Sequence, residues 1–289
     1  MKRLVAGVAH RGLAFLAFAG IATPGAGQPL PAPPALTAMV EAPCKVDLSA
    51  SPEVRAIIAS IVSGRKYAVT PAALTDFVAA RAAAPASDWP MLCVYKAANA
   101  QLASRPYAVF IGDSNTEYWS EVDSELFGRS VVGRGVGGQT SPQVLTRFYA
   151  DVVALRPEVV HILVGTNDIG GNTGLTTAQD WKNNVMAMAE LARAAKIRVV
   201  LASIPPVVAY PKHPEYRPRE TIRTLNIWLA TYAKEIGAAY VDYGAVLATT
   251  DGSARPELYF DGLHPNAAGY ALMRPLALQA IGAPPKGER

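Results

Sequence analysis

The sequence contains few cysteines, histidines and charged residues, which are the residue types that mark special structural classes. Its 289 residues include only two cysteines and four histidines, and charged residues make up 17%. Because half of the residues are apolar and few are charged, an intrinsically disordered chain is excluded. No apolar run is long enough to cross a bilayer, so a membrane-spanning segment is not expected. The length allows one large α/β domain or two small ones.

Acidic residues are absent before Glu41, and residues 1–27 have the pattern of a secretory signal peptide. Lys2, Arg3 and Arg11 precede an apolar run, Leu13 to Ala22, and small residues suit cleavage after Gly27. A short membrane anchor is the alternative. Removal of the segment lowers the net charge from +4 to about +1, so charge indicates neither nucleic acid nor anionic membrane as a partner. We expect a periplasmic or secreted protein without stable membrane insertion.

Both cysteines, Cys44 and Cys93, follow this predicted signal peptide. In an oxidising compartment, two cysteines without others favour a single disulfide. Closing a loop of about fifty residues would contribute roughly 4 kcal/mol in the chain-entropy model. Two buried free thiols are the alternative. A catalytic thiol is disfavoured because no histidine lies nearby in sequence.

The chain divides into segments of different composition. Residues 28–43 are rich in proline and alanine and are predicted to form a linker. Residues 44–105 carry apolar residues at helical spacing, which predicts a helical extension closed on itself by the disulfide. Residues 106–282 alternate between strand and helix patterns, and 283–289 form a short C-terminal tail.

Five β-rich runs alternate with helical patterns in the third segment. The strands are expected at 107–112, 130–136, 158–164, 198–204 and 239–243, and the last helix at 266–281. Strands separated by helices predict a parallel sheet that is covered on both faces. In such sheets, the functional residues lie at the carboxyl ends of the strands.

Polar clusters occupy those strand ends. They are residues 112–115 (GDSN), 135–139 (GVGGQ) and 165–168 (GTND), and a fourth cluster, 261–264 (DGLH), precedes the last helix. A parallel sheet would bring all four to one edge. Acyl transfer needs a nucleophile, a base, a carboxylate that orients the base, and donors for the oxyanion. Clusters of this composition can supply each part.

Three histidines remain as candidate bases after the signal peptide. His161 lies inside a predicted strand and is expected in the core, whereas His213 lies in a proline-rich loop and is expected in solvent. His264 follows Asp261 by three residues, a spacing that can place the carboxylate beside Nδ1. Taken alone, this pair equally fits half of a metal site or a helix-capping turn. Ser114 follows a strand near a predicted helix start at about residue 116, where backbone N–H groups favour negative charge.

Taken together, the four clusters resemble the four sequence blocks of the SGNH (GDSL-like) hydrolases, in the family's order, over roughly residues 106–282. The resemblance is strongest to the branch of platelet-activating-factor acetylhydrolase subunits and carbohydrate acetylesterases. It implies a flavodoxin-like three-layer α/β/α sandwich with a five-stranded parallel sheet. It also implies a serine esterase that hydrolyses a short-chain, preferably acetyl, ester on a carbohydrate or lipid, without a metal or organic cofactor.

The resemblance also implies the role of each site residue. Ser114 corresponds to the nucleophile, His264 to the base and Asp261 to the carboxylate that orients it. The oxyanion donors correspond to the backbone N–H groups of Ser114 and Gly138 and to the side-chain amide of Asn167. Gly138 is chosen because it directly precedes the polar residue of its block.

The chain departs from the family pattern at Asn115, where the motif has leucine, and this affects only the local shape of the site. Residues 28–105 have no counterpart in the compact family core. Tyr118, Trp119 and the loop 205–218 are expected to line the mouth of the site. Aromatic residues there suit a sugar ring and a lipid chain equally, so the partner is predicted only as a small-molecule or glycan ester.

Other functions fit the sequence less well than an esterase does. Glycines at 133, 135 and 138 match the dinucleotide fingerprint, but they follow the second strand and lack the acidic residue that the motif requires. The G-x-S-x-G motif of α/β-hydrolases is absent because Thr116 stands at its second glycine. Two alternatives stay open. One is an O-acetyltransferase that uses the same serine, since transfer and hydrolysis share the acyl-enzyme. The other is an inactive glycan-binding module.

Overall fold

The computed structural model describes Cys44 and residues 48–128, 130–174, 176–210, 213 and 215–282. The predicted signal peptide (1–27), linker (28–43) and C-terminal tail (283–289) lie outside the described residues. The segment boundaries given above stay predictions.

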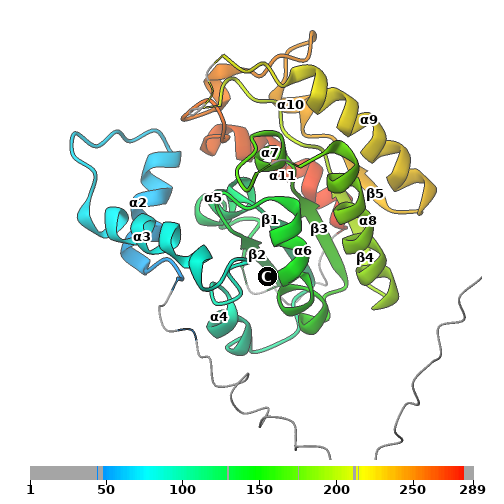
Figure 1. Ribbon diagram of the computed structural model, residues 1–289, viewed down its shortest axis with the longest axis horizontal. Helices are drawn as coiled ribbons and strands as arrows, with labels where there is room; N and C mark the ends of the chain where they lie inside the picture. The colour runs from blue at the N-terminus through cyan, green and yellow to red at the C-terminus, as the bar shows by residue number, and fades with distance from the viewer. Residues whose placement is uncertain are drawn as a thin grey trace, which may run out of the picture. The chain divides into compact units, whose positions relative to one another are not determined.

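A five-stranded parallel sheet forms the centre of the fold (Figure 1). Its strands are β1 (Ala108–Gly112), β2 (Val131–Gly135), β3 (Val159–Leu163), β4 (Arg198–Ala202) and β5 (Ala239–Val241), in the spatial order β2-β1-β3-β4-β5. This is the flavodoxin-like order, and it confirms the predicted fold class. The order reverses between β1 and β3, and ligands bind outside the carboxyl ends of strands at such a point.

Helices cover both faces of the sheet and complete three layers. On one face, α6 (Ser141–Asp151), α8 (Ala178–Ala194) and α9 (Arg219–Glu235) pack on alternate residues of the central strands. On the other face lie α5 (Ser114–Val122) and α11 (Ala267–Ile281). Short helical turns occur in the loops, namely α7 (Thr166–Ile169), α10 (Gly244–Leu247), η1 (Ala84–Ala86), η2 (Val153–Leu155) and η3 (Pro256–Leu258).

The starts of the longer helices follow from local sequence. Thr140 with Gln143, and Thr177 with Asp180, form capping boxes at α6 and α8, and Asn266 caps α11. Each cap satisfies backbone N–H groups that the first turn of a helix leaves unpaired. These polar residues therefore fix where the loops from the sheet end.

The predicted helical extension is present and consists of α2 (Pro52–Val62), α3 (Ala72–Ala83) and α4 (Lys96–Ala100). It also packs against the rest of the fold. Val54, Ile58 and Val62 belong to the same apolar cluster as Trp119 of α5 and Tyr107 at the start of β1. Since α2 has too few apolar residues to form a core alone, it buries its apolar face against α5.

The predicted disulfide is present, because Cys44 and Cys93 are both disulfide-bonded and neither is free. Within the part of the chain that the structure describes, no helix has the length and apolarity needed to span a bilayer.

Candidate active site

Ser114 lies at the first position of α5, directly after β1 and Asp113. The turn from strand to helix is so close to β3 that a Cβ on Gly112 would lie 2.1 Å from the carbonyl oxygen of Leu163. Only glycine fits there. Asp113 caps the helix by accepting the N–H of Asn115 at 2.9 Å. The helix therefore starts two residues earlier than predicted, and the serine lies at its N-terminus.

The structure brings Ser114, His264 and Asp261 together in one hydrogen-bonded chain. The Ser114 hydroxyl lies 2.8 Å from His264 Nε2, and His264 Nδ1 lies 2.7 Å from Asp261 Oδ2. A proton on Nδ1 that is donated to the carboxylate leaves Nε2 free to accept the serine proton. The other oxygen of Asp261 accepts the backbone N–H groups of Leu263 and His264, at 2.9 and 2.8 Å.

Aromatic side chains and charge hold this pair in place. Phe260 stacks on the imidazole of His264 with ring centroids 5.6 Å apart, and Tyr118 meets it edge-on at 5.0 Å. Burial raises the pKa of Asp261, but the hydrogen bond and the positive charge of His264 outweigh it and hold that pKa below its ordinary value. The carboxylate therefore stays ionised and fixes the orientation of the imidazole.

The prediction that Trp119 lines the mouth of the site is wrong. Its side chain is completely buried, donates Nε1–H to Asp123 at 3.1 Å and stacks on Tyr270. Successive residues of a helix point about 100° apart. Tyr118 therefore faces His264, while its neighbour faces the core.

The loop 205–218 borders the segment that carries the histidine. Val208 and Ala209 both donate their N–H groups to the carbonyl oxygen of Gly262, at 2.8 and 3.1 Å. Tyr210 donates its hydroxyl to the carbonyl oxygen of Thr166 at 2.8 Å. These described parts of the loop thus connect the end of β3 with the turn between Asp261 and His264.

The second polar cluster, residues 135–139, packs against the first turn of α5. A Cβ on Gly135 would lie 2.2 Å from the backbone nitrogen of Glu117, so this contact also requires glycine. Gly137 donates its N–H to Glu117 Oε2 at 2.7 Å. Among the described residues, the N–H groups of Gly138 and Ser114 have no acceptor. In this part of the chain the N–H of Gly138 is thus unused, whereas that of Gly137 is bound to Glu117.

Asn167 lies where the third cluster meets the second. Its side-chain nitrogen donates to the carbonyl oxygen of Gln139 at 2.9 Å and to Asp113 Oδ2 at 3.2 Å, and its oxygen accepts from Asn172 at 2.8 Å. These partners settle which end of the amide is the nitrogen. Both amide hydrogens already have acceptors, and the bond to Asp113 is the longer of the two.

The carboxyl group of Asp113 is buried beside the serine. Burial raises its pKa from 3.8 to about 6, although the N–H of Asn115 and the charge of His264 lower it in part. The amide nitrogen of Asn115 lies between Asp113 and Thr166, at 3.3 and 3.4 Å. The side chain that replaces the family's leucine is therefore buried, and it supports Asp113 without reaching an open part of the site.

Sequence reasoning missed two acidic residues that shape the loops. Asp168 accepts both the N–H and the hydroxyl of Ser141, at 3.0 and 2.5 Å, and so ties the third cluster to the start of α6. Glu117 holds Gly137, as described above. The spacing of three residues between Ser114 and Glu117 places both on one side of a helix and could have indicated the second contact.

The other histidines behave as predicted. His161 is fully buried with Nε2 2.7 Å from the hydroxyl of Tyr243, and burial lowers its pKa to about 3. The side chain of His213 is 57% exposed. Within the described ranges, no group of three or more His, Cys, Asp or Glu side chains is placed to hold a metal ion.

Comparison with known families identifies the chain. The sequence pattern of the GDSL-like Lipase/Acylhydrolase family matches residues 110–272, which is more than half of the chain and includes all four polar clusters. The chain belongs to the GDSL-like lipase/acylhydrolase family. This GDSL-like hydrolase is therefore a carboxylic ester hydrolase. Comparison with curated protein sequences finds no match.

Solved structures agree with this membership. A protein from Bacteroides fragilis designated an acylhydrolase is 36% identical, with a TM-score of 0.64 over 68% of this chain and 97% of that one. A GDSL-like lipase from Bacteroides thetaiotaomicron is also 36% identical, with a TM-score of 0.64 over 67% and 98%. A protein from Streptococcus pneumonia designated a platelet-activating factor is 28% identical, with a TM-score of 0.58 over 65% and 89%.

Acetylxylan esterases have the same fold. A variant of one from Geobacillus stearothermophilus is 20% identical, with a TM-score of 0.51 over 63% of this chain and 96% of that one. At this identity, the likeness concerns the fold alone.

Proposed function

We propose that this GDSL-like hydrolase removes short acyl groups, preferably acetyl, from small-molecule or glycan esters through an acyl-enzyme on Ser114. The observation that carries the proposal is the hydrogen-bonded chain from Ser114 through His264 to Asp261, with distances of 2.8 and 2.7 Å. A serine, an imidazole and an ionised carboxylate in this arrangement form the nucleophile, base and orienting group that acyl transfer requires. The preference for acetyl rests on the family resemblance.

In the first half of the reaction, His264 Nε2 takes the proton of the Ser114 hydroxyl as its oxygen attacks the ester carbonyl carbon. The carbonyl oxygen becomes a tetrahedral oxyanion. When the intermediate collapses, the bond to the alcohol oxygen breaks, and His264 returns the proton to the leaving alcohol. Asp261 stabilises the imidazolium while it exists.

The developing oxyanion needs preorganised donors. The backbone N–H groups of Ser114 and Gly138 supply two, since neither has another acceptor among the described residues. Asn167 supplies the third. Its side-chain amide, whose nitrogen donates to Asp113 at 3.2 Å, turns so that this N–H points at the oxyanion. Loss of one such donor typically lowers kcat by about 10²–10³-fold. We call residues 135–139, which carry Gly138, the oxyanion loop.

The second half of the reaction frees the acid. A water molecule gives a proton to His264 Nε2 and attacks the acyl carbon, and the same donors stabilise the second tetrahedral intermediate. Its collapse breaks the bond to the serine oxygen, which recovers the proton from His264. The stacked ring of Phe260 and the edge of Tyr118 keep the imidazole in place through both halves.

An acyl-length series with Ser114→Ala as the reference tests the proposal. The purified protein should hydrolyse p-nitrophenyl acetate with the highest kcat/KM of the series from acetate to octanoate, and Ser114→Ala should lower kcat by about 10⁴-fold or more. Ser120→Ala, on the same helix, is the matched control and should keep full activity. Retained activity in Ser114→Ala would refute the assignment. Acetylated xylan and acetylated sialic acid then compare carbohydrate classes as substrates.

We also propose that the protein acts in the periplasm or outside the cell. The disulfide supports this location, because such bonds persist in oxidising compartments. Expression of the full chain with separation of cell fractions tests it. The protein is expected in the periplasm or the medium without residues 1–27, whereas a full-length protein in the cytoplasm would contradict the proposal.

A further inference from the structure

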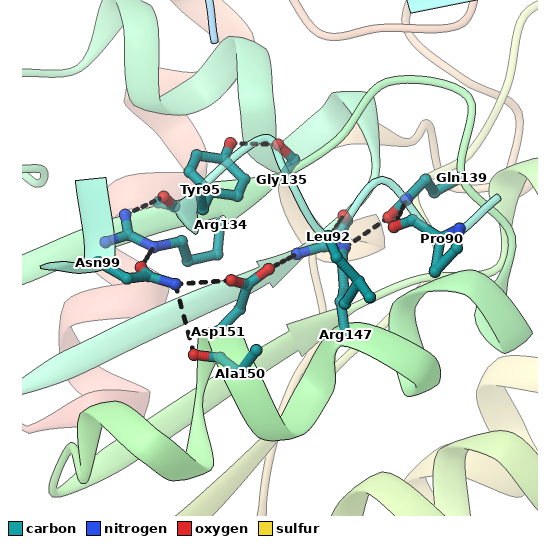
Figure 2. A network of polar contacts seen from close by, with 12 residues as sticks. Pro90, Leu92, Tyr95, Asn99, Arg134, Gly135, Gln139, Arg147, Ala150 and Asp151 are labelled. Carbon is teal, nitrogen blue, oxygen red and sulfur yellow. Dashed lines mark hydrogen bonds and ion pairs between the residues drawn. The ribbon is translucent and has the colours of Figure 1, made fainter. Parts of the chain in front are cut away.

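The oxyanion loop is in contact with the helical extension along most of its length. Tyr95 donates its hydroxyl to the carbonyl oxygen of Gly135, and the side chain of Gln139 donates to the carbonyl oxygen of Pro90 at 2.8 Å (Figure 2). Val136 is completely buried. It belongs to a small apolar cluster that is otherwise built by the extension, from Leu48, Ala84, Met91 and Val94.

The remaining contact runs through Glu117. Arg81 of α3 lies 3.1 Å from Glu117 Oε1, while Glu117 Oε2 accepts the N–H of Gly137 at 2.7 Å. The two side chains are only 12% and 9% exposed. Arg81 is itself anchored, because its Nε donates to the carbonyl oxygen of Leu48 at 2.6 Å. An arginine of the extension thus reaches the oxyanion loop through one carboxylate.

These contacts do not use one backbone N–H of the loop, that of Gly138. The extension holds residues 135, 136, 137 and 139, directly or through Glu117, and the N–H of Gly138 alone stays without an acceptor in the described part of the chain. A Cβ placed on Gly137 would lie 3.8 Å from that of Ser114, so the loop runs directly beside the nucleophile. A shift of about 1 Å in such a donor is enough to cost about 10²-fold in rate.

The charge of Arg81 has a second effect. A carboxylate beside the oxyanion loop opposes the negative charge that develops on the substrate, since like charges repel strongly in a site with little water. The guanidinium of Arg81 compensates that carboxylate. Without it, Glu117 would be a buried charge without an opposite charge beside it, which is strongly unfavourable.

We propose that the extension, residues 48–105, positions the oxyanion loop for catalysis, with Arg81 as a positioning residue that acts through Glu117. The proposal rests on the proposed function, because it needs Gly138 to be an oxyanion donor. It gives a role to a segment that precedes the family match at residues 110–272.

Arg81→Met and Arg55→Met form a matched pair for the test. Arg55 also joins the extension to α5, at 3.2 Å from Glu121, but this ion pair does not touch the oxyanion loop. With p-nitrophenyl acetate, Arg81→Met should lower kcat about 10–100-fold and change KM less than about threefold. Arg55→Met should stay within about twofold of the wild-type kcat.

Two further measurements separate positioning from a loss of folding. An alkyl boronic acid, which forms a tetrahedral adduct with the serine, should bind more weakly to Arg81→Met by about the same factor as kcat falls. Adding Glu117→Gln to Arg81→Met removes the uncompensated charge but keeps an oxygen for Gly137, and it should restore most of the lost kcat. Tyr95→Phe removes only the hydroxyl that donates to the carbonyl oxygen of Gly135. It provides a milder variant if Arg81→Met does not fold.

The outcomes are distinct. The proposal is overturned if a folded Arg81→Met keeps the kcat of Arg55→Met, or if its loss appears in KM alone. It is also overturned if Arg81→Met does not fold and Tyr95→Phe keeps wild-type kcat and boronic acid affinity. In each of these cases an inactive Ser114→Ala leaves the proposed function standing. Activity in Ser114→Ala would instead refute the proposed function itself.

Discussion

Replacement of Asp113 by asparagine should raise the stability relative to the wild type as the pH rises from 4 to 7.5, and it should lower the activity. The carboxyl group is buried, and its pKa is raised from 3.8 to about 6. The folded protein therefore binds this proton more tightly than the unfolded chain does. Stability from this group is fully present below pH 3.8 and is lost as the pH rises through 6.

The size of the effect follows from the shift. A difference of about two pKa units corresponds to roughly 3 kcal/mol of cost once the carboxyl is ionised in both states. Asparagine has the shape of the neutral form and escapes that cost. The stability of Asp113→Asn relative to wild type should thus increase by about 2 kcal/mol between pH 4 and pH 7.5, since part of the cost is already present at pH 4.

Urea unfolding of both proteins across this pH range measures the difference, in which the titrating groups that do not interact with Asp113 cancel. Asp251→Asn is a control of opposite sign, because hydrogen bonds from Thr249 and Ser253 lower the pKa of this exposed carboxyl to about 2. Its stability relative to the wild type should fall mainly between about pH 2 and pH 4 and change little above pH 4, so it gives a nearly flat reference over the range in which Asp113→Asn changes. A stability difference for Asp113→Asn that does not change with pH would refute the reasoning.

The activity of Asp113→Asn should change in the other direction. The oxygen that accepts the N–H of Asn115 must stay an oxygen, so the new amide nitrogen would face the amide nitrogen of Asn167. Asn167 then loses an acceptor that orients it. We expect kcat for p-nitrophenyl acetate to fall about tenfold, a fraction of the loss typical for removing a whole donor.

Two other variants test the site and its support. Asn167→Ala should lower kcat by about 10²–10³-fold with little change in KM, measured with p-nitrophenyl acetate, because the third oxyanion donor acts mainly in the transition state. An unchanged kcat would remove Asn167 from the donor set. Reduction of the disulfide should lower the free energy of unfolding in urea by about 4 kcal/mol, as closure of a loop of this size predicts. Equal midpoints with and without a reductant would contradict it.

The strands and the grouping of Ser114, His264 and Asp261 could be predicted from the sequence because both depend on local patterns. Runs such as 107–112 and 158–164 are apolar and β-branched, as buried parallel strands require, and β1 and β3 lie within them. Each polar cluster begins where such a run ends. The position of Ser114 beside His264 then follows from the topology of a parallel sheet.

The errors arose where the outcome depends on which side of a helix a residue faces. Trp119 and Tyr118 are adjacent aromatics, and the early start of α5 at Ser114 decided which one reaches the site. The ion pair between Arg81 and Glu117 spans 36 residues and leaves no periodic trace in sequence. Contacts of this kind emerge only from the packing of the extension on α5.

Two buried carboxylates flank the first turn of α5, and they are stabilised in different ways. Glu117 is paired with Arg81, whereas Asp113 relies on N–H donors and on the positive end of the helix, which favours negative charge. These donors do not fully offset the loss of solvent, as the raised pKa of Asp113 shows.

A neutral residue at this position would avoid the cost of burying the carboxylate. The ionised form nevertheless provides an acceptor for Asn167 that is held at the longer distance of 3.2 Å, so the amide can turn from Asp113 to the oxyanion. On the proposed mechanism, the stability lost at Asp113 is the cost of keeping the Asn167 donor oriented without binding it tightly, a trade between stability and activity that is common at enzyme sites.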